Sequence, residues 1–183
     1  LQEEWNKKGQ FSDFTAETLL HWISQIPQNK PPDRPWVIAG AMPTMATLRS
    51  TLLVPSNLGK RTPKFAVTNH PHYENVVIRW RTELVYSIFS RKPPEAVWRI
   101  YRDILKADFV VIEREGCLSS GALPGCSMAE IWDRLDPSLS HIQGNLCALA
   151  FSKDSFPLSI SSYFAPVFVS ADQTLVVWRI LPG

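Results

Sequence analysis

The alternation of three short apolar runs with segments of helical pattern constrains the fold of this chain more than any other feature. The apolar runs lie at residues 36–40, 65–67 and 109–112. Short apolar runs bounded by turn residues are typical of buried strands. Strands that alternate with helices form parallel sheets with helices packed on them. The sequence therefore predicts an α/β fold with a parallel three-stranded core.

Helical patterns occupy most of the chain before and between these runs, at residues 15–26, 42–53, 73–88 and 94–105. The last two carry apolar residues at intervals that place them on one face of a helix. In the long segment 73–88, the face expected to be buried consists of Tyr73, Val77, Trp80, Leu84 and Ile88. In the segment that begins at Pro94, the expected inner stripe consists of Val97, Tyr101, Ile104 and Leu105.

The last third of the chain adds a short helix at residues 128–135 and two strands at 164–169 and 174–181, joined by a four-residue turn. Two strands joined so closely form an antiparallel hairpin. The complete expectation is a mixed sheet with a parallel three-stranded core, flanking helices and a C-terminal antiparallel hairpin. At 183 residues the chain is long enough for one well-buried domain, so we expect a single domain over residues 1–183.

Composition excludes several classes of function. The net charge is +2, and Lys and Arg are interspersed with acids, so we expect no nucleic-acid partner. No stretch of 18 apolar residues is present, and the first ten residues do not resemble a signal peptide, so we expect a soluble domain that does not span a membrane.

The edge of the sheet at the carboxyl ends of the parallel strands is the expected place for a ligand. It brings together residues 40–44, 68–74 and 113–117, and we call these three segments the rim. The sequence contains no dinucleotide fingerprint, P-loop, nucleophile elbow or zincin motif. We therefore predict no cofactor and assign no catalytic residue.

The densest group of polar residues on the rim is His70, His72 and Glu74. Two imidazoles and a carboxylate suit zinc, but the sequence nominates no further ligand, so no metal site is predicted. One alternative is a structural turn, in which Asn69 caps the following helix, Pro71 fixes its entry and His72 bonds to the backbone. The other alternative is recognition of a bound polypeptide or glycan.

Three cysteines allow three single disulfide pairings. Cys117 and Cys126 flank a tight Gly/Ser/Pro loop, so this is the preferred pair, with Cys147 as the alternative partner. Three free thiols are the remaining possibility. A disulfide would indicate a secretory or luminal compartment.

Several long sequence runs resemble the carboxyl-terminal luminal domain of the protein C-mannosyltransferases, the dumpy-nineteen family. The resemblance extends over nearly the whole chain, from residues 17–23 to residues 163–168. The most specific runs are Gly40-Ala41-Met42-Pro43-Thr44-Met45-Ala46, Asn69-His70-Pro71-His72-Tyr73-Glu74, Arg81-Thr82, Val85-Tyr86-Ser87, Ser90-Arg91-Lys92, Pro124-Gly125-Cys126-Ser127-Met128 and Glu130-Ile131-Trp132-Asp133.

The resemblance implies a multi-spanning protein of the endoplasmic-reticulum membrane of which this chain is the luminal tail. Such enzymes transfer mannose from dolichyl-phosphate mannose to carbon 2 of tryptophan in W-x-x-W or W-x-x-C sequences of secretory proteins. Their catalytic carboxylates and donor site belong to the membrane part, so the resemblance implies that this fragment alone is inactive.

The order of elements is also similar to that of the soluble domain of the oligosaccharyltransferase catalytic subunit, where the motif after the first strand reads the acceptor peptide. By that likeness, the acceptor-binding candidates are Met42, Pro43, Thr44, His70, His72, Tyr73 and Glu74. Two departures, an insertion at residues 56–63 and a loop at 118–123 without basic residues, indicate a divergent member. The alternative functions are a non-catalytic membrane scaffold or anchor and a free-standing metal-dependent enzyme.

Overall fold

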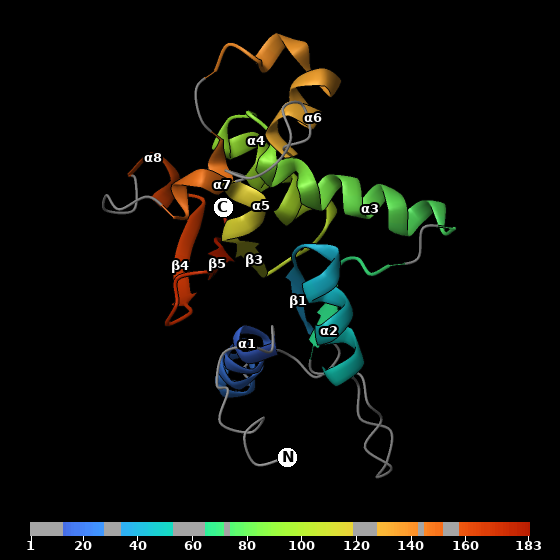
Figure 1. Ribbon diagram of the computed structural model, residues 1–183, viewed down its shortest axis with the longest axis vertical. Helices are drawn as coiled ribbons and strands as arrows, with labels where there is room; N and C mark the ends of the chain where they lie inside the picture. Colours follow the sequence, from blue (N-terminus) through green and yellow to red (C-terminus); the bar gives the residue numbers. More distant parts are fainter. Residues whose placement is uncertain are drawn as a thin grey trace, which may run out of the picture.

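The computed structural model describes residues 13–27, 34–52, 65–71, 74–118, 128–142, 145–151 and 158–183 (Figure 1). The predicted insertion at 56–63, His72, Tyr73 and Cys126 lie outside these residues. In chain order, the elements are α1 (Asp13–Gln25), β1 (Trp36–Ala39), α2 (Met42–Leu52), β2 (Phe65–Val67), α3 (Val76–Tyr86), the 3₁₀ turn η1 (Ser87–Phe89), α4 (Pro94–Arg99), the π-helical turn η2 (Ile100–Ile104), β3 (Phe109–Glu113), α5 (Arg114–Cys117), α6 (Met128–Leu135), the 3₁₀ turn η3 (Pro137–Leu139), α7 (Leu146–Leu149), α8 (Leu158–Ser161), β4 (Phe164–Val169) and β5 (Leu175–Ile180).

The five strands form one mixed sheet in the order β2-β1-β3-β5-β4. Strand β1 lies between β2 and β3 and runs parallel to both. Strand β5 pairs antiparallel with β3 and with β4, so the C-terminal hairpin extends one side of the parallel core. The predicted fold class is confirmed, including the parallel three-stranded core and the antiparallel hairpin.

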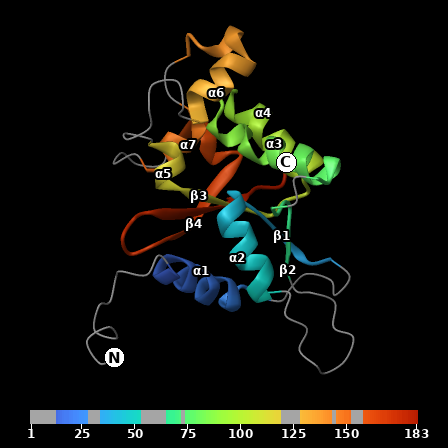
Figure 2. The ribbon, with the colours of Figure 1, turned by 45° about the vertical axis from the view of Figure 1, so that its right-hand side comes forward.

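Helices cover both faces of the sheet, and each face has its own apolar core (Figure 2). Strand β3 is buried on both sides because Val110 and Ile112 contribute to one core, whereas Phe109 and Val111 contribute to the other. Helices α1 and α2 pack on the second face, and α3, α4 and α7 lie on the first. A strand buried on both faces has a continuous apolar sequence, which is why residues 109–112 were recognisable.

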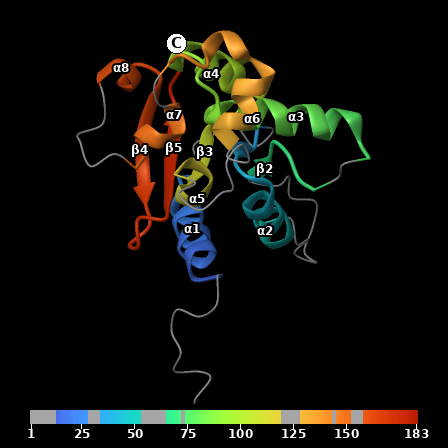
Figure 3. The same ribbon diagram turned by 45° about the horizontal axis from the view of Figure 1, so that its top comes forward.

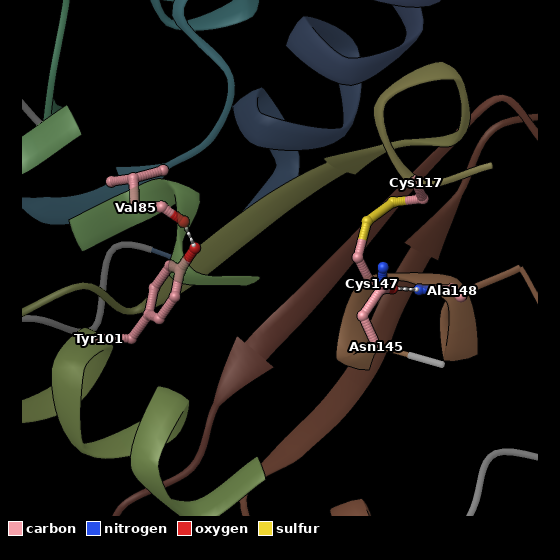
Figure 4. Close-up of a disulfide and its surroundings, with 6 residues drawn as sticks. All are labelled: Val85, Tyr101, Cys117, Asn145, Cys147 and Ala148. Atoms are coloured by element: carbon pink, nitrogen blue, oxygen red, sulfur yellow. Dashed lines mark hydrogen bonds between the residues drawn. A yellow bond between two sulfur atoms is a disulfide. The ribbon is translucent and has the colours of Figure 1, made fainter. Parts of the chain in front are cut away.

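Tyr101 fastens two elements of the first core together. It is fully buried, and its hydroxyl donates a hydrogen bond to the Val85 carbonyl of α3 (Figure 4). Burial raises the pKa of Tyr101 above its ordinary value, so the phenol remains a hydrogen-bond donor. The polar end of this large side chain is therefore satisfied inside an apolar layer.

The prediction of which residues of the long helix are buried is wrong for the first half of the helix. Val77 and Trp80 are 60% and 47% exposed, whereas Thr82 and Val85 are the buried residues of α3. Tyr73 lies outside the described residues. The cause is tertiary, because the N-terminal half of α3 extends past the sheet (Figure 3), where the sheet cannot cover it. Periodicity identifies an apolar face, but it does not say where the sheet ends.

The expected burial of Ile104 is also wrong, because its side chain is 44% exposed. Val97, Tyr101 and Leu105 are buried as expected. The helix that begins at Pro94 changes at Ile100 from α-helical to π-helical geometry. The Leu105 N–H donates to the Ile100 carbonyl, which is a bond across five residues. Within this wider turn an α-helical period no longer gives the correct face, so Ile104 turns outward while its neighbour Leu105 is buried.

The disulfide joins Cys117 of α5 to Cys147 of α7 (Figure 4). The preferred pairing of Cys117 with Cys126 is therefore wrong, and the alternative partner is confirmed. The Cα atoms of Cys117 and Cys147 are 5.4 Å apart, within the normal span of a disulfide. Both residues belong to the first core, which brings together helices that are far apart along the chain.

Asp172 organises the tip of the β4–β5 hairpin. Its carboxylate accepts hydrogen bonds from the Ser170 hydroxyl at 2.6 Å and the Thr174 backbone N–H at 3.1 Å. The Thr15 hydroxyl of α1 also donates to it, at 3.3 Å. These bonds, with that from Ser170 the strongest, lower the pKa of Asp172 to about 2.

Replacing Ser170 by alanine is expected to raise the pKa of Asp172 toward the ordinary value near 4. Since the pKa is lower in the folded state, the carboxylate stabilises the fold above pH about 4, and this contribution disappears as the pH falls toward about 2. NMR titration of the side-chain carboxyl carbon measures the pKa. Ser159→Ala, on the exposed side of α8, is the control. An unchanged Asp172 titration in Ser170→Ala would contradict the assignment.

None of the helices in the described ranges is both long and apolar enough to cross a membrane.

Candidate functional site

The ends of the three parallel strands meet at one edge of the sheet. The Thr44 hydroxyl, at the start of α2, donates a hydrogen bond to the Glu113 carboxylate at the end of β3. The Asn69 side-chain amide, beyond β2, donates to the Gly40 carbonyl beyond β1 at 3.2 Å. The rim segments that sequence predicted to lie together are therefore connected by direct contacts.

Buried polar groups that are hydrogen-bonded to one another lie at the base of the rim. Thr68 and Asn69 are buried, and the Thr68 hydroxyl donates to the Asn69 side-chain oxygen at 2.7 Å. The Arg81 guanidinium reaches across from α3 and donates to the carbonyls of Thr68 at 2.8 Å and Leu105 at 3.1 Å. The buried polar groups at the end of β2 thus bond to one another and to the backbone, which holds the turn that follows.

Gly40 keeps the backbone of the rim close to the sheet. A Cβ atom at this position would lie 2.7 Å from the Met45 Cε and 3.2 Å from the Val111 carbonyl oxygen. The methionine end could move, but the β3 backbone could not move without disturbing the sheet. Glycine is therefore required where the chain passes from β1 into α2.

The predicted acceptor-binding residues differ in accessibility. Met42, Thr44 and His70 are half-buried, and Pro43 and Glu74 are exposed. The Met42 backbone N–H donates to the Tyr86 hydroxyl at 3.3 Å, which ties the start of α2 to α3. The rim as described therefore offers an apolar side chain, a proline ring, a hydroxyl and an imidazole that a ligand could reach. His72 and Tyr73 are outside the described residues.

Asn75, rather than Asn69, caps the helix that follows the rim. The Asn75 side-chain oxygen accepts from the backbone N–H groups of Val77 at 3.0 Å and Ile78 at 3.1 Å. Asn69 is instead turned into the fold toward Gly40. The expectation that Asn69 caps this helix is wrong because α3 begins at Val76, so Asn75 is the residue that precedes its first turn.

Among the described residues, no three His, Cys, Asp or Glu side chains are grouped closely enough to hold a metal ion.

A second polar contact joins α6 to the segment between η1 and α4. Arg91 and Asp133 form a two-point ion pair with N–O distances of 2.6 and 2.9 Å, and Arg91 also donates to the Ile142 carbonyl at 2.6 Å. Lys92 pairs with Asp136 at 3.0 Å. The hydrogen bond with Asp133 raises the pKa of Arg91 above its ordinary value. Residues 128–142, which lie at the top of Figure 1, are thereby fixed to the body of the domain.

Comparison with known proteins identifies the family. A family model described as Dpy19, Q-cell neuroblast polarisation, matches residues 1–177. The chain belongs to the Dpy19 family. It is 42% identical over 137 residues to protein C-mannosyl-transferase DPY19L1 of Mus musculus, which covers 75% of the chain and 16% of the mouse protein.

Two further relatives cover almost the whole of this Dpy19 chain. Probable C-mannosyltransferase DPY19L2 of Homo sapiens is 35% identical over 184 residues, which is 99% of the chain and 20% of that protein. C-mannosyltransferase dpy-19 of Caenorhabditis elegans is 33% identical over 186 residues, which is 98% of the chain and 24% of that protein. The chain spans about a fifth of the length of these relatives. The family resemblance inferred from the sequence motifs is confirmed.

Two contacts were not predicted from the sequence, the Arg91–Asp133 ion pair and the Met42–Tyr86 hydrogen bond. Each of them connects two of the sequence runs that resemble the Dpy19 family. Arg91 and Asp133 lie in two runs 42 residues apart, and Tyr86 and Met42 lie in two others. The α6 run by itself showed only a short amphipathic helix. No signal in the sequence indicated its charged partner, because Glu95 lies much closer to Arg91 along the chain than Asp133 does.

Replacing Arg91 by alanine is expected to lower the free energy of unfolding by about 1–2 kcal/mol, because it leaves a mostly buried Asp133 without its charged partner. Both side chains are 20% exposed. Arg99→Ala is a matched control, since Arg99 pairs with Glu95 at the same 2.6 Å but the side chains are 64% and 49% exposed. An exposed pair of this kind contributes about 0.5 kcal/mol or less. Urea denaturation measures both variants, and equal losses would contradict the stabilising role of the Arg91 pair.

Proposed function

We propose that this Dpy19 chain is the luminal domain of a protein C-mannosyltransferase and that its rim helps to bind the acceptor polypeptide. Relatives that are 33–42% identical over most of the chain carry the name C-mannosyltransferase, which supports a role in this chemistry. The proposed reaction joins the anomeric carbon of mannose to carbon 2 of a tryptophan indole in a W-x-x-W or W-x-x-C sequence. Dolichyl phosphate leaves, and the indole loses its C2 proton.

The observation that carries the rim proposal is that residues 40–46, a long motif run, contact both other rim segments. Gly40 accepts from Asn69, and Thr44 donates to Glu113. Loops fixed at the carboxyl ends of parallel strands are where such folds bind ligands. Thioether sulfur packs well against aromatic rings, so a half-buried Met42 suits an indole-bearing peptide.

We place the reacting groups elsewhere in the full-length protein. The chain spans about a fifth of its relatives, and we assign the donor site and the base that removes the indole proton to the remainder. In this proposal, the parent protein spans the endoplasmic-reticulum membrane and this domain faces the lumen. The disulfide between Cys117 and Cys147 supports an oxidising compartment.

The test is a transfer assay of the full-length protein with dolichyl-phosphate mannose and a W-x-x-W peptide. Met42→Ala and His70→Ala are each expected to raise the KM for the peptide about fivefold, the effect of losing a contact of about 1 kcal/mol. The KM for the lipid donor should not change. Leu158→Ala is the control, because α8 leads into β4 at the opposite end of the sheet from the rim and Leu158 is 87% exposed.

Two outcomes would contradict different parts of the proposal. Normal transfer with unchanged peptide KM in both variants would remove the rim from acceptor binding. Absence of transfer by the unaltered full-length protein would favour a non-catalytic family member that acts as a membrane scaffold or anchor.

A further inference from the structure

Helix α3 has a second apolar face that this domain leaves uncovered. Val76, Val77 and Trp80 are 67%, 60% and 47% exposed, and they continue toward Leu84, which packs at the margin of the first core. At about 100° per residue, these four side chains lie within about a quarter to a third of the circumference of the helix. We call them the α3 stripe.

The stripe lies away from the surface by which α3 is attached to the domain. Thr82 and Val85 are the buried residues of the helix, and Arg81 bonds to carbonyls of the rim and of the segment after η2. Figures 1 and 3 both show the N-terminal half of α3 extending beyond the sheet. The α3 stripe therefore leads from the margin of the core out to a projecting helix end.

This projecting end is stabilised in helical form by its own N-terminal cap. The Asn75 cap bonds the N–H groups of Val77 and Ile78, which satisfies donors that would otherwise favour fraying. The apolar side chains are consequently presented on a preformed surface. Single exposed apolar residues are ordinary, but neighbouring large ones on one face mark an interaction site.

We infer that the α3 stripe is an intramolecular docking surface for an apolar face of the remaining part of the same Dpy19 polypeptide. The mouse, human and worm relatives extend over four to six times the length matched here, so most of such a protein lies outside the 183 residues. A permanent contact within one protein suits a surface this apolar, because obligate interfaces are more hydrophobic than transient ones. This inference rests on membership of the family and not on acceptor binding by the rim.

The charges beside the stripe favour a protein surface over a lipid surface. Arg79 and Glu83 flank it, and Glu74 precedes it, all of them exposed. Helices that lie on anionic membranes carry an excess of Lys and Arg on the polar face. Here the two signs are mixed, which gives no electrostatic attraction to anionic lipid.

Hydroxyl-radical footprinting of the full-length protein tests the inference, with Trp178 as an internal reference because it is 0% exposed. If the rest of the polypeptide covers the stripe, Trp80 is expected to be oxidised at a rate within about threefold of Trp178, as for any close-packed indole. A faster rate overturns the inference. Protection that appears only with a W-x-x-W peptide, only at high protein concentration or only in lipid vesicles also overturns it, in favour of acceptor, second-copy or lipid contact respectively.

A variant provides an independent measurement. Val77→Gln combined with Trp80→Gln alters side chains that are exposed in this domain, so a bare surface predicts almost no effect on stability. If the surface is covered, the Tm of the full-length protein is expected to fall by about 2 °C or more. Leu158→Gln, at 87% exposure, is the matched control and should leave the Tm unchanged. An unchanged Tm in the double variant overturns the inference, whatever the rim variants do to the peptide KM.

Discussion

Replacing Cys147 by alanine is expected to lower the free energy of unfolding by about 3–4 kcal/mol in the chain-entropy description of a disulfide. Cys117 and Cys147 are separated by 30 residues, so their bond excludes many conformations of the unfolded chain. Alanine is preferable to serine because Cys147 is completely buried and a hydroxyl there would need a partner. Cys117→Ala should cause a loss of similar size.

Cys126→Ala is the control that separates the two pairings. With the Cys117–Cys147 bond, this variant should keep the disulfide and nearly all of the stability. Urea denaturation with and without a reducing agent measures the free energies, and a non-reducing peptide map identifies the joined peptides. A large loss in Cys126→Ala together with little loss in Cys147→Ala would reverse the assignment.

The error in the sequence-based pairing has a physical origin. Closeness along the chain favoured Cys126, because a short loop closes at low entropic cost. The fold instead places α5, at the end of β3, beside α7 in the first core. Hydrophobic burial of these helices brings the two cysteines together, and no local pattern in the sequence records it.

The sheet could be predicted almost completely, because its signals are local. Strands β1, β2 and β3 are short apolar runs, and the β4–β5 hairpin has a short polar turn at residues 170–174. The side of a helix that is buried was less predictable. Val77 and Trp80 follow a helical period as well as Val85 does, and only the position of the sheet determines which of them is covered. Ile104 was misplaced by a local change of helical geometry that propensity does not indicate.

The rim was predictable because it follows from topology rather than from individual residues. Once the three parallel strands are known, their carboxyl ends must share an edge, and the contacts of Gly40 and Thr44 follow this rule. The Arg91–Asp133 pair does not follow from any such rule. It joins residues 42 positions apart on elements outside the sheet, and several other acids were equally available to Arg91 in the sequence.

Replacing Trp178 by alanine is expected to lower the free energy of unfolding by about 3–5 kcal/mol, the range for removing a large aromatic side chain from a core. Trp178 is 0% exposed in the middle of β5, where it is paired with Val110 on β3 and Pro166 on β4. Its ring lies 5.5 Å from that of Phe164. The cavity would therefore open in the first apolar core, on the face of the sheet that Trp178 shares with Val110 and Phe164.

Trp80→Ala in this 183-residue chain is the matched control, because it makes the same chemical change at a side chain that is 47% exposed. It should cost about 0.5 kcal/mol or less. Far-UV circular dichroism during urea denaturation measures both variants, and Trp178→Phe provides a milder change if the alanine variant does not fold. Hydrogen exchange should also accelerate at Ile112 and Glu113, which pair with Val176 and Leu175 of β5. Equal losses in the two tryptophan variants would mean that the burial of Trp178 in the hairpin does not stabilise the domain.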